Sequence, residues 1–218
     1  MTNIGSYEER IKNFDWSISS SELEYREGDK INIGWYCSDR ICKQGKNDKI
    51  ALYYKGFGGA EKQYTFNDVR LRSNTIGSFL REIGVVNGDR ICLFMDRVPE
   101  LYFSFLGVLK IGAIVQPLFS AFGDESLYVR LENAQTRAII TQKKHLSKVR
   151  KIKDELPHLE FIIIIDHKES HELKDREIAL DLERRAPVEE LEIYPTEAES
   201  PSVLHYTSGT TGQPKGVK

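Results

Sequence analysis

Residues 137–166 read RAIITQKKHLSKVRKIKDELPHLEFIIIID, and this stretch decides the fold class. Residues 137–141 and 160–166 are rich in isoleucine and predict two strands, the second covered on both faces. Between them, four apolar residues recur at the spacing of one helix face. They are Leu146, Val149, Ile152 and Leu156. A helix that connects two strands lets them pair in parallel, so the stretch predicts a β–α–β unit.

The preceding segments continue this alternation of strands and helices. Residues 90–95 (RICLFM) and 113–116 predict strands, and residues 99–112 predict a helix with Pro99 in its first turn. Leu127, Leu131 and Ala134 form the apolar stripe of another helix. The predicted fold class is therefore α/β, a doubly wound, mostly parallel sheet flanked by helices. Sheets of this kind bind ligands at the carboxyl ends of their strands.

The outer parts of the chain are less regular. Residues 50–54 predict a strand. A helix is expected to begin after Thr65 as its N-cap, with Asp68 in the first turn, and to end at Gly84. Residues 167–200 are polar and acidic, and we expect them to wrap the surface before a last strand.

Composition excludes several classes of protein. The 218 residues carry 31 Lys and Arg against 33 Asp and Glu, which argues against nucleic-acid binding because that affinity needs surplus positive charge. The apolar run Phe161–Ile165 is far shorter than the roughly 20 residues of a membrane span. The acidic N-terminus shows no secretory signal, and three cysteines without a C-x-x-C pair fit a reducing compartment. We therefore expect a cytoplasmic protein.

Residues 207–216 carry the strongest functional signal. Three glycines let the backbone turn tightly and approach a ligand, hydroxyl groups add donors, and a lysine adds positive charge. This combination predicts a polyphosphate site. Its residues are Thr207, Ser208, Gly209, Thr210, Thr211, Gly212, Lys215 and Gly216. The pattern is not a Walker A loop, because Lys215 is followed by glycine rather than by Ser or Thr.

The run YTSGTTGQPKGV at residues 206–217 closely resembles the phosphate-binding loop of the adenylate-forming superfamily, which includes acyl-CoA synthetases, luciferases and non-ribosomal adenylation domains. Further landmarks resemble its acetyl-CoA synthetase branch. They lie at residues 14–16, 64–66, 88–90, 99–101, 107–113 and 130–134. The resemblance implies an N-terminal extension over residues 1–60. It also implies that residues 61–218 are the first part of an AMP-binding adenylation domain, in a chain that stops soon after the phosphate loop.

The same resemblance implies a function. The full-length enzyme would be an AMP-forming acetate–CoA ligase that uses ATP, Mg²⁺ and coenzyme A. It joins acetate to AMP, releases pyrophosphate, and then transfers the acetyl group to coenzyme A. No catalytic residue or metal ligand of the family has a counterpart here, so the chain alone is expected to be inactive. A ligase for another short acid such as propionate, or a non-catalytic remnant, stays an alternative, and self-association through surface left uncovered is expected.

Several other residues are weaker candidates for ligand binding. Phe119, Ser120 and Ala121 resemble the family segment near the coenzyme A adenine, although Phe119 and Phe122 can equally be core residues. A basic helix is either a coenzyme A contact or, as we favour, a solvated face. Its charges are Lys143, Lys144, Lys148, Arg150, Lys151 and Lys153. His167 and His171 have metal-ligand spacing but no third ligand nearby, and for Asp96 and Arg97 a charged loop is favoured over a ligand crevice.

Overall fold

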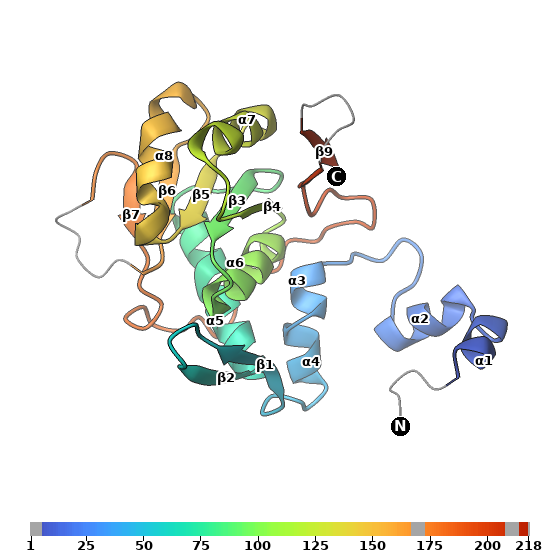
Figure 1. The fold of residues 1–218 in the computed structure, drawn as a ribbon. Helices are drawn as coiled ribbons and strands as arrows, with labels where there is room; N and C mark the ends of the chain where they lie inside the picture. The colour runs from blue at the N-terminus through green and yellow to red at the C-terminus, as the bar shows by residue number, and fades with distance from the viewer. Residues whose placement is uncertain (1–5, 167–172, 208–213, 218) are drawn as a thin grey trace.

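A five-stranded parallel sheet forms the centre of the protein (Figure 1). The computed structural model describes residues 6–166, 173–207 and 214–217. The sheet has the order β4-β3-β5-β6-β7, and every neighbouring pair is parallel. Its strands are β3 (Arg90–Met95), β4 (Ile114–Phe119), β5 (Ala138–Thr141), β6 (Phe161–Ile164) and β7 (Glu177–Ala179). The predicted α/β class and parallel pairing are confirmed.

Two layers of helices cover the two faces of this sheet. The helices are α5 (Phe66–Glu82), α6 (Pro99–Lys110), α7 (Asp124–Ala134) and α8 (Leu146–Ile152). Ile91 and Leu93 of β3 belong to the core with α5 and α6, whereas Cys92 and Phe94 belong to the core with α7 and α8. This alternation follows from the two-residue period of a strand, and it explains why β3 carries apolar side chains on both of its faces.

Helix α5 begins and ends where its sequence predicts. The Thr65 hydroxyl accepts a hydrogen bond from the Asp68 amide at 3.1 Å, and the Asp68 carboxylate accepts one from the Thr65 amide at 2.8 Å. This reciprocal capping box satisfies two amides that the first turn leaves unpaired. Beyond the last turn, Gly84 has φ of +90°, which a residue with a Cβ adopts only under strain.

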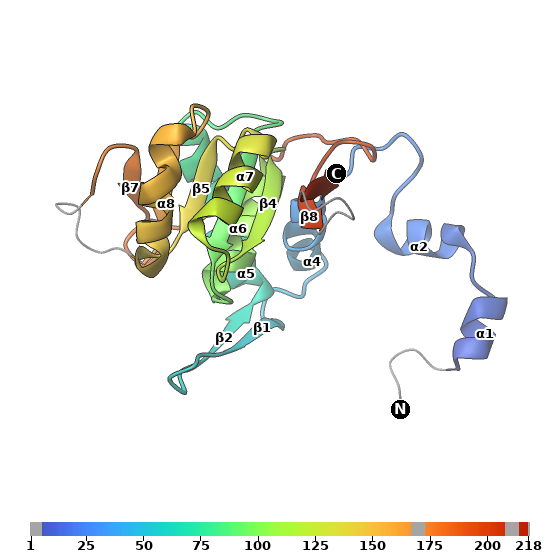
Figure 2. The ribbon, with the colours of Figure 1, turned by 45° about the horizontal axis from the view of Figure 1, so that its top comes forward.

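The first sixty residues are more helical than expected. Four short helices precede the hairpin of β1 (Ile50–Lys55) and β2 (Glu61–Thr65). They are α1 (Tyr7–Lys12), α2 (Trp16–Leu23), α3 (Ile33–Tyr36) and α4 (Asp39–Lys43). At four to eight residues they are too short to show a helical stripe in the sequence. In Figures 1 and 2, α1 and α2 lie apart from the sheet.

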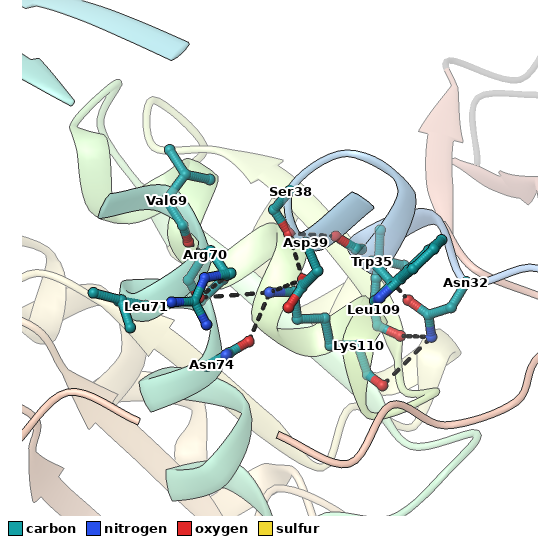
Figure 3. Close-up of polar contacts among 12 residues, drawn as sticks. Asn32, Trp35, Ser38, Asp39, Val69, Arg70, Leu71, Asn74, Leu109 and Lys110 are labelled. Atoms are coloured by element: carbon teal, nitrogen blue, oxygen red, sulfur yellow. Dashed lines mark hydrogen bonds and ion pairs between the residues drawn. The ribbon is translucent and has the colours of Figure 1, made fainter. Parts of the chain in front are cut away.

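A buried ion pair fixes α4 to the helix layer (Figure 3). Lys110, at the end of α6, is fully buried, and its Nζ lies 2.6 Å from Asp39 Oδ2 and 2.7 Å from Asn74 Oδ1. Next to it, Asn32 Nδ2 donates to the carbonyl oxygen of Leu109 at 2.8 Å. These contacts join the N-terminal segment to α5 and α6, and no pattern in the sequence predicts them.

Residues 188–203 form a strap, here called the return strap, that crosses from α5 to the edge of the sheet. The Val188 amide donates to Thr75 Oγ1 at 3.1 Å, and the Tyr194 amide donates to the Lys110 carbonyl at 2.8 Å. The strap then reaches β4, where Val203 forms a parallel bridge with Val115. The expectation that residues 167–200 wrap the surface is therefore correct only in part. Residues 188–200 run over the helices, whereas residues 177–179 form β7 at the edge of the sheet, and residues 167–172 lie outside the described residues. Across the described ranges, the structure contains no helix that is both long and apolar enough to span a bilayer.

Candidate functional site

A cavity of about 1010 Å³ opens at the carboxyl ends of β3, β4 and β5. Its lining includes Met95, Phe119 and Gln142 at or just after these strand ends. The chain reverses its winding direction here, because β4 lies on one side of β3 and β5 lies on the other. Such a reversal leaves a crevice above the sheet, where α/β proteins bind their ligands. The cavity therefore lies where the sequence predicts a site.

A two-stranded hairpin borders this cavity. Strands β8 (His205–Thr207) and β9 (Lys215–Val217) are antiparallel, with Thr207 opposite Lys215 and Tyr206 opposite Gly216. His205 and Tyr206 line the cavity, and β8 contacts β4 (Figure 2). The hairpin thus carries both ends of the predicted phosphate loop, beside the carboxyl end of the sheet.

The predicted phosphate-binding residues fall into two groups. Thr207, Lys215 and Gly216 lie on the hairpin and are exposed, whereas Ser208, Gly209, Thr210, Thr211 and Gly212 lie outside the described residues. At Gly216, an added Cβ would lie 3.1 Å from Leu204 Cδ1 and 3.3 Å from Tyr206 Cζ. The small size of Gly216 therefore makes room for the Tyr206 ring, a reason that the sequence analysis missed.

The segment of residues 119–122, here called the aromatic turn, lines the same cavity as the hairpin. Phe119 is 72% exposed, so it is not a core residue, and its ring meets that of Phe122 edge to face at 5.7 Å. Lys148 Nζ holds the turn by donating to the carbonyl oxygens of Ser120 at 2.8 Å and Phe122 at 2.9 Å. Phe119, Ser120 and Ala121 all line the cavity. An exposed aromatic ring beside a cavity is suited to stacking on a planar ligand.

A polar network lies between β3 and β5 at the bottom of the crevice. Asp96 binds the ammonium group of Lys144, and its Oδ1 lies 2.9 Å from His145 Nε2. The Asp96 amide donates to Gln142 Oε1 at 2.9 Å. Hydrogen bonds from Lys144, Ser120 and His145 hold the pKa of Asp96 well below its usual range. Asp96 and Arg97 form a charged loop, as the sequence analysis favoured, and both also line the cavity, so a place in the ligand crevice stays a prediction.

Most charges of the basic helix have protein partners. Arg150 forms two hydrogen bonds of 2.8 Å with Glu177, and Lys151 lies 2.9 Å from Asp124. With Lys148 bound to carbonyl groups, this segment mainly supports β7 and the aromatic turn. It is therefore neither a bare solvated face nor a free cationic patch. His167 and His171 lie outside the described residues.

Three residues that line the cavity were missed or undervalued in the sequence. Lys144 and Gln142 follow the end of β5, and Tyr206 precedes the phosphate loop. Their position just after or beside predicted strand ends was the available signal. Partial burial raises the pKa of the Tyr206 hydroxyl, so this hydroxyl stays protonated at neutral pH.

Comparison with known sequences places these features in context. The sequence model of a family described as AMP-binding enzyme matches residues 39–218. The acetyl-coenzyme A synthetase of Bacillus subtilis (strain 168) is 38% identical over 216 residues, which are 99% of this chain and 37% of that protein. The acetyl-coenzyme A synthetase of Alkalilimnicola ehrlichii is 28% identical, over 92% of this chain and 33% of that protein. The chain thus spans 37% and 33% of the length of these two relatives.

Two solved structures of CoA-ligating enzymes also resemble this chain. An acyl-CoA synthetase of Brucella canis matches 97% of this chain with a TM-score of 0.82 and 29% identity, over 37% of its own length. The anthranilate CoA ligase AuaEII, solved in complex with anthranoyl-AMP, matches 86% of this chain with a TM-score of 0.74 and 26% identity, over 34% of its own length. The resemblance that the motifs indicated is confirmed.

Proposed function

Because the chain belongs to the AMP-binding enzyme family, we propose that it carries the phosphate-binding part of an adenylate-forming acyl-CoA ligase. The observation that carries this proposal is the hairpin. It brings the two ends of the sequence TSGTTGQPKG together beside a cavity at the carboxyl ends of the sheet. The ligand proposed for the loop is the β- and γ-phosphate tail of ATP.

The chemistry of the first step explains the residue types. A carboxylate oxygen attacks the α-phosphorus of ATP, the bond to the bridging oxygen breaks, and pyrophosphate leaves with its negative charge. Lys215 and the hydroxyl and amide donors of the loop would stabilise that charge, since donors that are already in place gain most where charge develops. Mg²⁺ would share this task when bound. Within the described ranges no group of three carboxylate, histidine or cysteine side chains gathers as metal ligands, so we assign no residue to it.

We propose coenzyme A as the second ligand of the cavity. In the second step its thiolate attacks the carbonyl carbon of the acyl-adenylate, and AMP leaves. Phe119, Ser120 and Ala121 lie on the cavity wall, and the exposed Phe119 ring offers a stacking surface to an adenine. The volume of about 1010 Å³ accommodates a nucleotide-sized ligand.

Acetate is the proposed acid, on the strength of relatives named acetyl-coenzyme A synthetase. Another short acid such as propionate is the second candidate. No described residue is assigned to the acid or to proton transfer, and the chain spans 37% of the Bacillus relative. We therefore expect the 218 residues alone to form no acyl-adenylate, as measured by acetate-dependent exchange of labelled pyrophosphate into ATP. Exchange above the enzyme-free background would contradict this expectation.

Binding is tested separately from turnover. Thermal unfolding is measured with pyrophosphate, and with ATP, in the presence of Mg²⁺. A ligand that binds only the folded chain raises the unfolding temperature in proportion to its affinity. Lys215→Ala should remove most of this rise, whereas Lys62→Ala, which removes another exposed lysine of a two-stranded hairpin, should keep it. No rise in the unchanged chain, or an equal rise in the Lys215 variant, would refute the proposed phosphate site.

A further inference from the structure

Arg130 lies between the two ligand-facing segments of the cavity. It projects from α7, and its guanidinium carbon is 4.3 Å from the ring centroid of Phe122 and 6.0 Å from that of Tyr206. Phe122 belongs to the aromatic turn, and Tyr206 belongs to the hairpin of the phosphate loop. One side chain therefore contacts both segments through their aromatic rings.

Hydrogen bonds hold both the backbone and the side chain of Arg130. Its carbonyl oxygen accepts a hydrogen bond from Gln116 Nε2 at 3.1 Å, and the buried Gln116 Oε1 accepts one from Thr136 Oγ1 at 2.6 Å. The Arg130 Nη1 donates to the Ser126 carbonyl oxygen at 2.7 Å. Within the described ranges its Nε is buried and donates to no acceptor. Gln116 of β4 thus holds the backbone of Arg130, and the Ser126 carbonyl of α7 holds the guanidinium next to the two rings.

Tyr206 has a second attachment to the same helix. Its hydroxyl donates to Asn133 Oδ1 at 2.7 Å. The ring of Tyr206 also fills the space that Gly216 leaves on the opposite strand. Movement of the Tyr206 ring therefore moves both strands of the hairpin.

We propose that Arg130 is a positioning residue that fixes the hairpin of the phosphate loop and the aromatic turn relative to each other. This proposal rests on the proposed function for the identity of the ligands, a polyphosphate at the hairpin and an adenine-bearing thiol cofactor at the turn. A planar guanidinium can stack on a ring and keep its hydrogen bonds in its own plane, which a lysine ammonium cannot do. Loss of Arg130 then releases both segments, whereas loss of any other single contact releases only one.

Amide hydrogen exchange of the full 218-residue chain tests, without a ligand, whether Arg130 holds the hairpin and the aromatic turn. In Arg130→Met we expect the amides of β8 and β9 to exchange about tenfold faster, which corresponds to a loss of about 1.4 kcal/mol in the free energy of local opening. The amide of Phe122, which donates to the Phe119 carbonyl at 3.0 Å, should exchange faster by the same factor. Lys148→Met should accelerate only the aromatic turn, and Tyr206→Phe only the hairpin. Arg130→Lys should restore the rates only in part.

Two outcomes of this experiment overturn the proposal. In one, Arg130→Met leaves either segment at the rate of the unchanged chain. In the other, it accelerates β3 and β5 as much as the two segments, which would show general destabilisation rather than positioning.

Ligand titration separates this proposal from the proposed function. With pyrophosphate and coenzyme A as probes, Arg130→Met should weaken both affinities several-fold, Tyr206→Phe only that for pyrophosphate, and Lys148→Met only that for coenzyme A. If the unchanged chain binds neither probe, the proposed function fails for this chain, and the exchange rates still decide the role of Arg130. If it binds both and Arg130→Met binds both equally well, Arg130 is not a positioning residue.

Discussion

At the scale of the residue, the buried ammonium of Lys110 shows how one charge organises distant segments. Burial lowers the pKa of Lys110, and the nearby Asp39 carboxylate opposes that effect. A buried charge with a close, hydrogen-bonded partner is tolerated, whereas the same charge without its partner is strongly destabilising. Asp39 and Asn74 therefore keep α4 and α5 next to the end of α6.

Asp39→Asn tests this arrangement. The substitution keeps the shape but removes the negative charge, so an uncompensated ammonium stays in the core. We expect the free energy of unfolding to fall by about 3–5 kcal/mol in urea titrations at neutral pH. The double variant Asp39→Asn, Lys110→Met should recover part of this loss, because it removes the unpaired charge. A single variant as stable as the unchanged chain would show that the pair is not needed.

At the scale of the element, helices α5 and α6 approach closely because two glycines face each other. A Cβ on Gly107 would lie 2.7 Å from the Ser73 carbonyl oxygen, and a Cβ on Gly77 would lie 3.1 Å from the Gly107 carbonyl oxygen. Backbone atoms cannot yield as a flexible side chain does. The two helices must therefore separate to admit even a methyl group.

Gly107→Ala is expected to lower the free energy of unfolding by about 1–3 kcal/mol despite the higher helix propensity of alanine. Urea titration monitored by circular dichroism measures the change. The control is Ser78→Ala, near the end of α5, where the serine hydroxyl donates to the exposed Glu82 carboxylate at 3.2 Å. Equal or greater stability of Gly107→Ala would mean that the helix pair adjusts freely.

A buried carboxylate adds to the backbone pairing that holds strand β7 at the edge of the sheet. Burial alone would raise the pKa of Glu177, but Arg150 and the Lys174 amide bind the carboxylate and keep its pKa below the usual value. The pairing thus stabilises the fold above the unfolded pKa of about 4.3 and is lost as the pH falls through the lower folded pKa.

Glu177→Gln should therefore cost about 2 kcal/mol at pH 7, and this cost should shrink as the pH falls below about 4. Unfolding in urea at several pH values checks it. Glu160→Gln, which alters a more exposed pair with Arg137, should cost much less at every pH. A cost for Glu177→Gln that does not change with pH would exclude the ionised carboxylate as its source.

The elements that the sequence predicted share a physical property. α5, β3, α6, β5 and β6 each bury an apolar face or a whole strand, so their periodicity is visible. By contrast, α1 to α4 are short, and β7 has three residues, of which Glu177 is buried through a charge pair. Tertiary partners rather than local patterns create these elements.

At the scale of the whole molecule, the sequence predicted residues that lie near one cavity but not the contacts that connect their segments. Thr207, Lys215 and Phe119 were predicted from motifs, and all lie on segments around the cavity. The contact of Arg130 with Tyr206 was not predicted, because the hairpin lies more than seventy residues after α7 in the chain. The contact of Arg130 with Phe122 is local, but no motif indicates it. The order of residues in a motif indicates which ligand the residues bind. How two loops lie relative to each other depends on tertiary packing, which a motif does not show.

The exposed apolar side chains of α1 and α2 predict self-association. Neither helix buries a residue, and Tyr7 and Trp16 are 69% and 76% exposed. Apolar surface gathered on two adjacent helices favours contact with a second copy. We expect the sedimentation coefficient to rise with protein concentration, and Phe14→Ser with Trp16→Ser to reduce that rise. A single monomeric species at all concentrations would contradict this prediction.

The return strap has a consequence for biosynthesis. Val188, Tyr194 and Val203 meet residues that lie far before them in the chain, at Thr75, Lys110 and Val115. A ribosome makes the strap after α5, α6 and β4, so its contacts with Thr75, Lys110 and Val115 form only once these later residues emerge. Nascent chains arrested before residue 188 should therefore recruit chaperones more strongly than chains arrested beyond residue 204.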